Sequence, residues 1–342
     1  MTRYFQKAAP FLLAIFMLTF SSCKKDSTST PEPVEPRVFV IGMEDTGTGY
    51  LARQWKNGVS STITNGSLNV DLRSVFVSGQ DVYHAGMSSG GSTLPFATIW
   101  KNGIVSPLSD GNTSSLASSV YVSGNDVYVA GYIHNGLRKV ATLWKNGVAS
   151  DLTDGTMEAE ALSVFVSGSD VYVAGFDGYI ATVWKNGVAT SLTDGVEEAA
   201  AKSIYVSGSD VYVAGFYGDV ASGRKAMLWK NGTPTELSDG LQYAEATSVF
   251  VKDADVYIAY HDGGIAKIWK NGTNMSLNSA TAYAEVYSVF VHESDVYAAG
   301  YMFDPNDPLD EPTLWKNGVA TPLSTTDQSF GVAFSVFVAP GN

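Results

Sequence analysis

Seven copies of the tetrapeptide Trp-Lys-Asn-Gly constrain the fold of this chain more than any other feature. They begin 40 to 46 residues apart and contain every tryptophan of the 342-residue sequence. A period of this length indicates a propeller or another array of repeated units. The copies begin at Trp55, Trp100, Trp144, Trp184, Trp229, Trp269 and Trp315.

Each Asn-Gly pair predicts a tight hairpin, because both residues accept the positive φ that a type I′ turn requires. Strand-like runs flank the pair, as at 141–144 and 148–152. The tryptophan is then the last large residue before the turn. We interpret the seven rings as one packing anchor per repeat, and the alternative is a ring of sugar-stacking platforms.

The repeat contains four strands. Within 161–195, runs of β-branched, small and aromatic residues lie at 163–166, 171–175, 181–184 and 188–192, with turn sequences between them. The first two runs are apolar on both faces, which is typical of strands covered on both sides. The repeat therefore predicts an all-β fold of four-stranded antiparallel units.

The two ends of the repeat region predict a closed ring. The region opens with a second strand at Val38 and closes with a first strand at Val336, so that each completes the other. An open stack would leave sheet faces exposed, and a solenoid would need polar end caps. We predict a seven-bladed β-propeller over 37–342, closed by pairing of its N- and C-terminal strands.

The strand order, the tryptophan near the end of the third strand and the closing latch resemble WD-repeat and kelch-like propellers. Lys follows each Trp where WD repeats have Asp, and the kelch double glycine is missing. The resemblance implies the propeller architecture and does not place the chain in either family.

The N-terminus resembles that of a bacterial lipoprotein. A signal peptide is expected over 1–22, with basic Arg3 and Lys7 before the apolar stretch 11–20. Cys23 follows two serines, as in a lipobox, where the thiol is acylated. The resemblance implies lipidation at Cys23 and a lipid-anchored protein of the cell envelope, at the outer membrane, facing the periplasm or the surface. The alternative is ordinary secretion with a chance cysteine.

Residues 23–36 combine this cysteine with a tether rich in Ser, Thr and Pro, a composition typical of extended linkers. Beyond it the chain has 17 basic and 31 acidic residues, a net charge of −14. Nucleic-acid binding needs a basic surface. We therefore expect no nucleic-acid partner, a membrane contact through the N-terminal lipid, and a monomer.

The connections within the repeat form two sets at opposite edges of the blades. The turns after strands one and three are nearly constant, and we call their edge the constant face. The loops after strands two and four vary, and we call their edge the variable face. On the constant face, each repeated Lys is expected to meet the Asp that begins strand two, unless that Asp caps its turn; Arg37 replaces this Asp in the first unit. A sevenfold polyanion site there is an alternative use of the lysines.

The variable face is the predicted binding surface, because function usually resides in variable loops on a rigid scaffold. Acidic and aromatic residues alternate in its loops, a combination that suits a glycan or a protein ligand. The alternative is a solvated face on which the aromatic residues cover blade edges. The predicted ligand-binding residues are Glu158, Glu160, Phe176, Glu197, Glu198, Phe216, Tyr217, Tyr243, Glu245, Tyr283, Glu285 and Tyr301.

Motifs for catalysis and metal binding are weak. The Gly-x-Ser-x-Gly match at 86–90 lies between strands, not at a strand-to-helix elbow, and the four histidines lack zinc-ligand spacing. No cofactor is expected, although one oxygen-rich segment is a weak Ca²⁺ candidate. Its ligands would be Asp304, Asn306, Asp307 and Asp310.

These observations predict a non-catalytic, lipid-anchored propeller that binds a glycan or a protein. One alternative is a scaffold lipoprotein in outer-membrane assembly. The other is a polysaccharide hydrolase or lyase that uses paired carboxylates of the variable face.

Overall fold

The computed structural model describes residues 35–45, 49–63, 69–90, 94–219, 223–304, 307–324 and 330–341, without the side chains of 304 and 307–309. Across these residues it contains 28 strands and no helix. Glu35–Asn342 is one compact unit. Cys23 lies outside the described residues, as does part of the proposed Ca²⁺ segment.

The strands form seven antiparallel sheets of four, and we number these blades from the one in which the chain ends meet. The blades are: blade 1, β28 (Gly331–Ala339), β1 (Arg37–Asp45), β2 (Tyr50–Lys56) and β3 (Val59–Thr62); blade 2, β4 (Asn69–Ser78), β5 (Asp81–Ser89), β6 (Phe96–Lys101) and β7 (Ile104–Pro107); blade 3, β8 (Ser115–Ser123), β9 (Asp126–His134), β10 (Lys139–Lys145) and β11 (Val148–Asp151); blade 4, β12 (Ala159–Ser167), β13 (Asp170–Asp177), β14 (Ile180–Lys185) and β15 (Val188–Ser191); blade 5, β16 (Ala199–Ser207), β17 (Asp210–Tyr217), β18 (Lys225–Lys230) and β19 (Thr233–Glu236); blade 6, β20 (Ala244–Lys252), β21 (Asp255–Asp262), β22 (Ile265–Lys270) and β23 (Thr273–Ser276); blade 7, β24 (Tyr283–His292), β25 (Asp295–Asp304), β26 (Asp307–Lys316) and β27 (Val319–Pro322).

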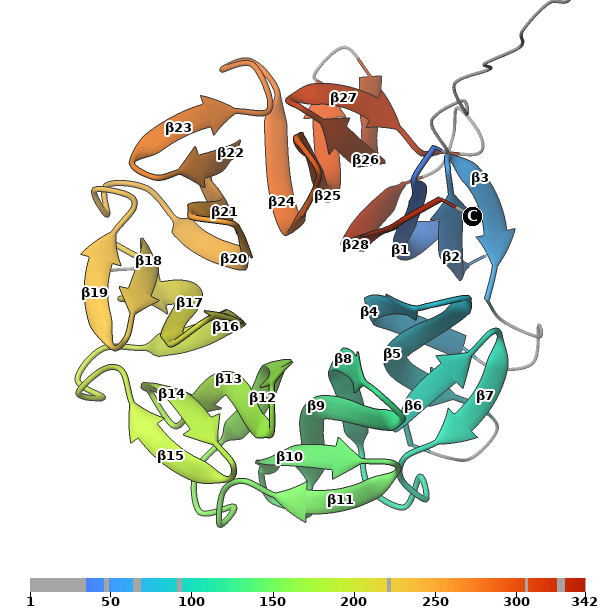
Figure 1. Ribbon diagram of the computed structural model, residues 1–342, viewed down its shortest axis with the longest axis vertical. Helices are drawn as coiled ribbons and strands as arrows, with labels where there is room; N and C mark the ends of the chain where they lie inside the picture. The colour runs from blue at the N-terminus through green and yellow to red at the C-terminus, as the bar shows by residue number, and fades with distance from the viewer. Residues whose placement is uncertain are drawn as a thin grey trace, which may run out of the picture. The chain divides into compact units, whose positions relative to one another are not determined.

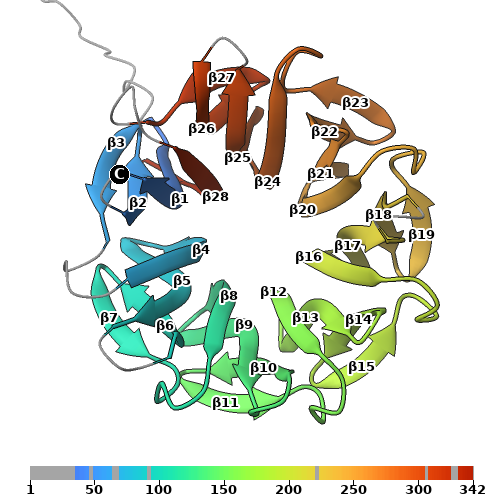
Figure 2. The same ribbon diagram turned by 180° about the vertical axis from the view of Figure 1, so that it is seen from behind.

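The blades surround a central axis (Figures 1 and 2). The inner strands β28, β4, β8, β12, β16, β20 and β24 face the centre, and the fourth strands form the rim. In blade 1, β28 pairs with β1, with Val38 opposite Val338 and Val40 opposite Val336. The predicted seven-bladed propeller and its closing latch are thus confirmed.

The Trp-Lys-Asn-Gly turns have the expected backbone, with φ of 47–52° at Asn and 79–96° at Gly. In blade 4, Asn186 accepts a hydrogen bond from the Val171 N–H at 2.9 Å and donates to Asp170 at 2.8 Å. Lys185 Nζ lies 2.7 Å from the same carboxylate. This Lys-Asp-Asn arrangement recurs in six blades. Arg37 stands in the Asp position of blade 1 and donates to blade 2 instead.

The repeated tryptophans fill the space between neighbouring sheets. Six are buried, and Trp269 is partly buried. Trp184 of blade 4 packs in one cluster with Tyr128 of blade 3. The indole N–H of Trp144 donates to the Leu108 carbonyl oxygen of the preceding blade at 3.1 Å. The ring therefore contributes to the contact between blades.

A belt of serines joins the inner strands. Each hydroxyl oxygen accepts a hydrogen bond from a backbone N–H of the next inner strand, over 3.1–3.4 Å. The bonds form a closed circle that crosses the latch from Ser335 to Val75. The belt consists of Ser74, Ser119, Ser163, Ser203, Ser248, Ser288 and Ser335.

Seven aromatic side chains, which together we call the aromatic ring, surround the axis. Each lies two residues after the belt serine of its inner strand, toward the constant face. Neighbouring ring centroids are 4.6–5.1 Å apart, and the contacts form one closed cycle through all seven inner strands. Such a cycle narrows the central channel. Its members are Phe76, Tyr121, Phe165, Tyr205, Phe250, Phe290 and Phe337.

Candidate functional site

The central channel contains a chamber on the variable-face side of the aromatic ring. The residue before each belt serine is the extra residue of a β-bulge, where the pairing register shifts. All seven bulge residues line a cavity of ≈ 330 Å³. Because this position differs between blades, the chamber is asymmetric. It is lined by Arg73, Ser118, Leu162, Lys202, Thr247, Tyr287 and Phe334 at the bulges, with Leu116, Glu160 and Glu245 nearer the variable face.

A second cavity, the channel mouth, continues the chamber toward the variable face and has a volume of ≈ 600 Å³. The two cavities share six lining residues, so they form one continuous hollow. The shared residues are Arg73, Leu116, Glu160, Leu162, Lys202 and Glu245, and the mouth adds Lys139, Glu158, Phe176, Gly178, Tyr179, Glu198, Ala199, Ala200, Phe216 and Arg224.

Glu160 is held on the inner wall by two polar partners. Lys139 Nζ, from β10 of the neighbouring blade, lies 3.1 Å from one carboxylate oxygen. The Ser118 hydroxyl donates to the other oxygen over 3.1 Å. Only 8 % of Glu160 is exposed, so little water reaches it. Lys139 and Ser118 therefore provide most of the compensation for its negative charge.

Arg224 joins three residues of the mouth. Its guanidinium donates to Glu198 at 2.8 Å and forms a short contact with Glu245. It also lies 3.8 Å from the centroid of the Phe216 ring, a cation–π arrangement. Tyr243 donates its hydroxyl to the same Glu245 at 2.5 Å. Arg224 is 8 % exposed, so these contacts hold it within the wall.

The charge state of Glu245 follows from these contacts. Burial alone would raise the pKa of this carboxyl, but attraction to Lys202 and hydrogen bonds from Tyr243 and Arg224 bring the pKa below its ordinary value. Glu245 is therefore a carboxylate at neutral pH, and Lys202 Nζ lies 3.2 Å from it.

A cluster of tyrosines surrounds Glu285 on blade 7. Tyr283 and Tyr287 each donate a hydroxyl to Glu285 at 2.6 Å. The Tyr301 ring lies 6.2 Å from the rings of both tyrosines. Tyr287 is also a chamber residue, so this cluster extends the hollow on one side.

Blade 6 departs from the repeat beside the mouth. In blade 4, a Cβ on Gly175 would lie 2.0 Å from the Glu160 carbonyl oxygen, which explains why glycine occupies this position in the other six blades. Blade 6 has the buried Tyr260 there. The next residue, His261, stacks on Tyr243 with centroids 5.8 Å apart. Burial lowers the pKa of His261, although Glu285 and Glu245 oppose the shift, so the ring is neutral at pH 7.

The structure brings together part of the predicted variable-face surface. Six predicted residues line the mouth: Glu158, Glu160, Phe176, Glu198, Phe216 and Glu245. Tyr243 contacts two wall residues from outside the lining, while Tyr283, Glu285 and Tyr301 form the adjacent cluster. Tyr217 instead lines a separate pocket with residues of β15 and β19, and Glu197 lies outside the lining.

The prediction missed every basic residue of the hollow. Arg73, Lys139, Lys202 and Arg224 line it, in equal number to the acids Glu158, Glu160, Glu198 and Glu245. The prediction considered only loop residues, whereas Arg73 and Lys202 lie on inner strands. A comparison of the inner strands with one another would have found them, because the residue before the belt serine varies while the following residues repeat.

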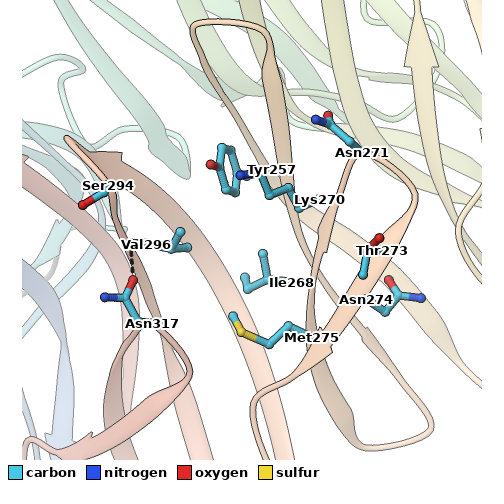
Figure 3. Close-up of a pocket in the computed structure, with 10 residues that line it drawn as sticks. All are labelled: Tyr257, Ile268, Lys270, Asn271, Thr273, Asn274, Met275, Ser294, Val296 and Asn317. Atoms are coloured by element: carbon cyan, nitrogen blue, oxygen red, sulfur yellow. Dashed lines mark hydrogen bonds between the residues drawn. The ribbon is translucent and has the colours of Figure 1, made fainter.

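A groove on the constant face, between blades 6 and 7, has a similar volume of ≈ 580 Å³ (Figure 3). Its wall includes Tyr257, Lys270 and Asn317, where Asn317 accepts a hydrogen bond from Val296 N–H at 2.8 Å. A smaller groove between blades 2 and 3 shares the repeat positions of Tyr257, Ile268, Lys270, Val296 and Asn317. Because this groove is built from residues of the repeat, the asymmetric channel is the better candidate for a single specific site.

Metal and membrane features are few in the described part of the chain. No group of three or more His, Cys, Asp or Glu side chains there could hold a metal ion. For the proposed Ca²⁺ ligands, only the Asp310 side chain is described, and burial raises its pKa, with a further contribution from Glu285. No described helix is long and apolar enough to span a membrane.

Comparisons with known proteins concern the fold. No protein-family model matches the chain, and no curated protein matches its sequence. Among solved structures, a puromycin-hydrolysing peptidase of Mycobacterium tuberculosis is similar, with a TM-score of 0.47 and 11 % sequence identity. The match covers 74 % of this chain and 53 % of the peptidase, so this chain spans about half the length of that protein.

Proposed function

We propose that this protein is a lipid-anchored propeller of the cell envelope that binds a glycan in the channel mouth and chamber, without catalysing its cleavage. The main support is the lining of the hollow: four basic and four acidic side chains balance there, within a domain of strongly negative net charge. Sugar hydroxyls both donate and accept hydrogen bonds, so a balanced polar lining suits them.

The aromatic walls support the same ligand class. Phe176, Tyr179 and Phe216 line the mouth, and Tyr179 is 62 % exposed. Aromatic faces offer flat apolar surfaces to the C–H faces of sugar rings. The volumes of the chamber and the mouth, ≈ 330 Å³ and ≈ 600 Å³, are also within the range of ligand-binding pockets.

Within the hollow, the contacts of three acids support a binding role over glycoside cleavage. A glycosidase needs one carboxyl group that is protonated at working pH, with a raised pKa. Glu245 has a lowered pKa, and Glu160 and Glu198 are each ion-paired with a basic residue. In this arrangement the acids orient Lys139, Lys202 and Arg224.

The test is a glycan array probed with the full chain, carrying Cys23→Ser to remove the acylation site. We expect binding to a restricted set of glycans and a loss of at least about tenfold in affinity with Tyr179→Ala, which removes an exposed platform. Tyr50→Ala, at a 58 % exposed tyrosine that does not line the hollow, is the matched control. Absence of any glycan signal, or equal effects of both changes, would refute glycan binding in the mouth.

Exposed apolar side chains on the variable face favour a second candidate, a protein-binding scaffold. Leu137, Val196 and Leu241 are 88 %, 75 % and 80 % exposed in its loops. Crosslinking in envelope preparations tests this role: a membrane protein captured by the wild type and lost in a Leu137→Ser/Leu241→Ser variant, together with a silent glycan array, would favour the scaffold.

The anchor has its own test. Cys23→Ser should move the protein from the membrane fraction to the soluble fraction and abolish labelling with a clickable fatty acid. A variant that stays in the membrane would contradict lipidation at Cys23.

A further inference from the structure

The chamber contains two cations that the repeat does not require. Arg73 of β4 and Lys202 of β16 occupy the bulge position, which is uncharged in the other five blades. Their strands are separated by two blades on one side of the ring and three on the other, so β4 and β16 lie on nearly opposite sides of the axis (Figure 1). Both residues line the chamber. Placing two cations in a confined space is costly unless an anion neutralises them.

The neighbouring carboxylates satisfy these cations only in part. Arg73 donates from one terminal nitrogen to Asp71 at 2.6 Å, and its guanidinium lies 5.0 Å from the Phe334 ring centroid. Among the described residues, its Nε and other terminal nitrogen have no hydrogen-bond partner, and 39 % of the side chain is exposed. Arg73 therefore has N–H donors that remain open to the chamber.

Lys202 is similarly available. Its ammonium group lies 3.2 Å from Glu245, and 33 % of the side chain is exposed. That carboxylate is already held by Arg224 and by the Tyr243 hydroxyl. An ammonium group carries three donors, so Lys202 can bind a further anionic oxygen while it keeps this contact.

Two of the three hydroxyl-bearing residues that line the chamber, Ser118 and Thr247, add acceptors. Ser118 donates its proton to Glu160, and Thr247 donates to the Val286 carbonyl oxygen at 2.8 Å. With their protons committed, both oxygens can accept hydrogen bonds from hydroxyls beside a ligand anion. The aromatic ring lies beyond them toward the constant face, so the charged end of a ligand would stop at this depth.

From this arrangement we infer that the glycan of the proposed function is acidic, and that the carboxylate of a terminal uronic acid binds between Arg73 and Lys202 in the chamber. The inference rests on the proposed function and narrows its ligand class. Charge-assisted hydrogen bonds are the stronger kind. The remaining sugar rings would lie in the mouth against its aromatic walls.

The test compares trimers of galacturonic, glucuronic and mannuronic acid with their carboxyl-reduced, neutral counterparts, on an array and then by calorimetry with the full chain carrying Cys23→Ser. We expect at least one acid to bind at least about tenfold more tightly than its reduced form. Arg73→Gln and Lys202→Gln should each lower the affinity for the acid by at least about tenfold more than the affinity for its reduced form, and so remove this preference. Lys225→Gln, which breaks an exposed pair with Glu236 outside the hollow, is the matched control.

The outcomes separate the inference from the proposed function. If a reduced trimer or another neutral glycan binds as well as every acid, the acidic-sugar inference fails and glycan binding stands. If no acidic or neutral glycan binds, both fail. If an acid is preferred but the preference survives both substitutions with the fold intact by circular dichroism, the ligand is acidic and the assignment to Arg73 and Lys202 is wrong.

Discussion

Replacing the buried His84 should remove part of the acid sensitivity of this propeller. His84 lies on β5 of blade 2, is 1 % exposed, and its Nε2 lies 2.7 Å from Gln54 Oε1 of blade 1. Because a carboxamide oxygen can only accept, Nε2 carries the proton and Nδ1 is the lone-pair nitrogen. Nδ1 is buried and has no hydrogen-bond partner among the described residues. Protonating the ring would place a charged, unsatisfied N–H at the boundary between these blades.

The pKa of His84 sets how much the free energy of unfolding changes with pH. Burial lowers the pKa of His84 from 6.5 to about 4. The unfolded chain takes up a proton as pH falls through 6.5, whereas the folded protein does so only near pH 4, so stability decreases with falling pH between these values. Between pH 7.5 and pH 4.5 this one group should reduce the free energy of unfolding by about 2.5 kcal/mol.

The assay is urea unfolding from pH 7.5 to pH 4.5 for the wild type and His84→Val. Valine occupies the corresponding position in blades 1, 3, 4 and 5, so the substitution fits the repeat. Loss of the Gln54 contact costs the same at every pH, and therefore cancels from the pH dependence. The variant should lose about 2.5 kcal/mol less than the wild type over this range. Val173→Ala, at the corresponding buried position of blade 4, is the control: it changes packing without removing a titratable group, and should retain the wild-type slope. Identical pH profiles for wild type and His84→Val would refute the argument.

Three further predictions concern the scaffold. Trp184→Ala should lower the free energy of unfolding by about 3–5 kcal/mol, because the ring is 1 % exposed between blades; a loss below about 1 kcal/mol in urea unfolding would contradict its packing role. Gly175→Ala should cost about 2 kcal/mol or more, since the new Cβ would meet the Glu160 carbonyl oxygen at 2.0 Å; Gly168→Ala, which meets nothing within 4 Å, should cost about 1 kcal/mol through its positive φ alone. Deleting 335–342 removes most of β28 and should open the ring, seen as a lower melting temperature and a larger hydrodynamic radius; an unchanged melting curve would show that the latch is dispensable.

The scaffold was predictable because its causes are local and occur seven times. Asn-Gly favours a turn that few other pairs adopt. The strand at Val38 opens the repeat region without a first strand, and the strand at Val336 closes it without a second strand, so the two could pair only with each other. The predicted Lys-Asp pairs follow from the same register, since a hairpin fixes which residues lie side by side on neighbouring strands. Seven copies of one pattern left little room for another fold.

The site was predictable only in part, because it depends on contacts between blades. Glu160 and Glu245 stand out as acids in the sequence, but their partners Lys139 and Arg224 belong to neighbouring blades. No spacing along the chain relates them. The aromatic ring and the serine belt were also missed, although both recur in every repeat, because strand alternation alone does not reveal which residues of an inner strand face the axis once a bulge shifts the register.

That bulge links the scaffold to the proposed function. A propeller of identical blades would present the same side chain seven times around its axis, and a sevenfold ring suits a symmetric or extended ligand better than one small asymmetric molecule. The extra residue of each bulge is not paired in the ladder, so it can change without loss of backbone hydrogen bonds. The belt serine beside it meanwhile keeps its contact with the next blade. Variation at the bulges can therefore break the symmetry of the channel at little cost to the ring, and it is at these positions that Arg73 and Lys202 stand.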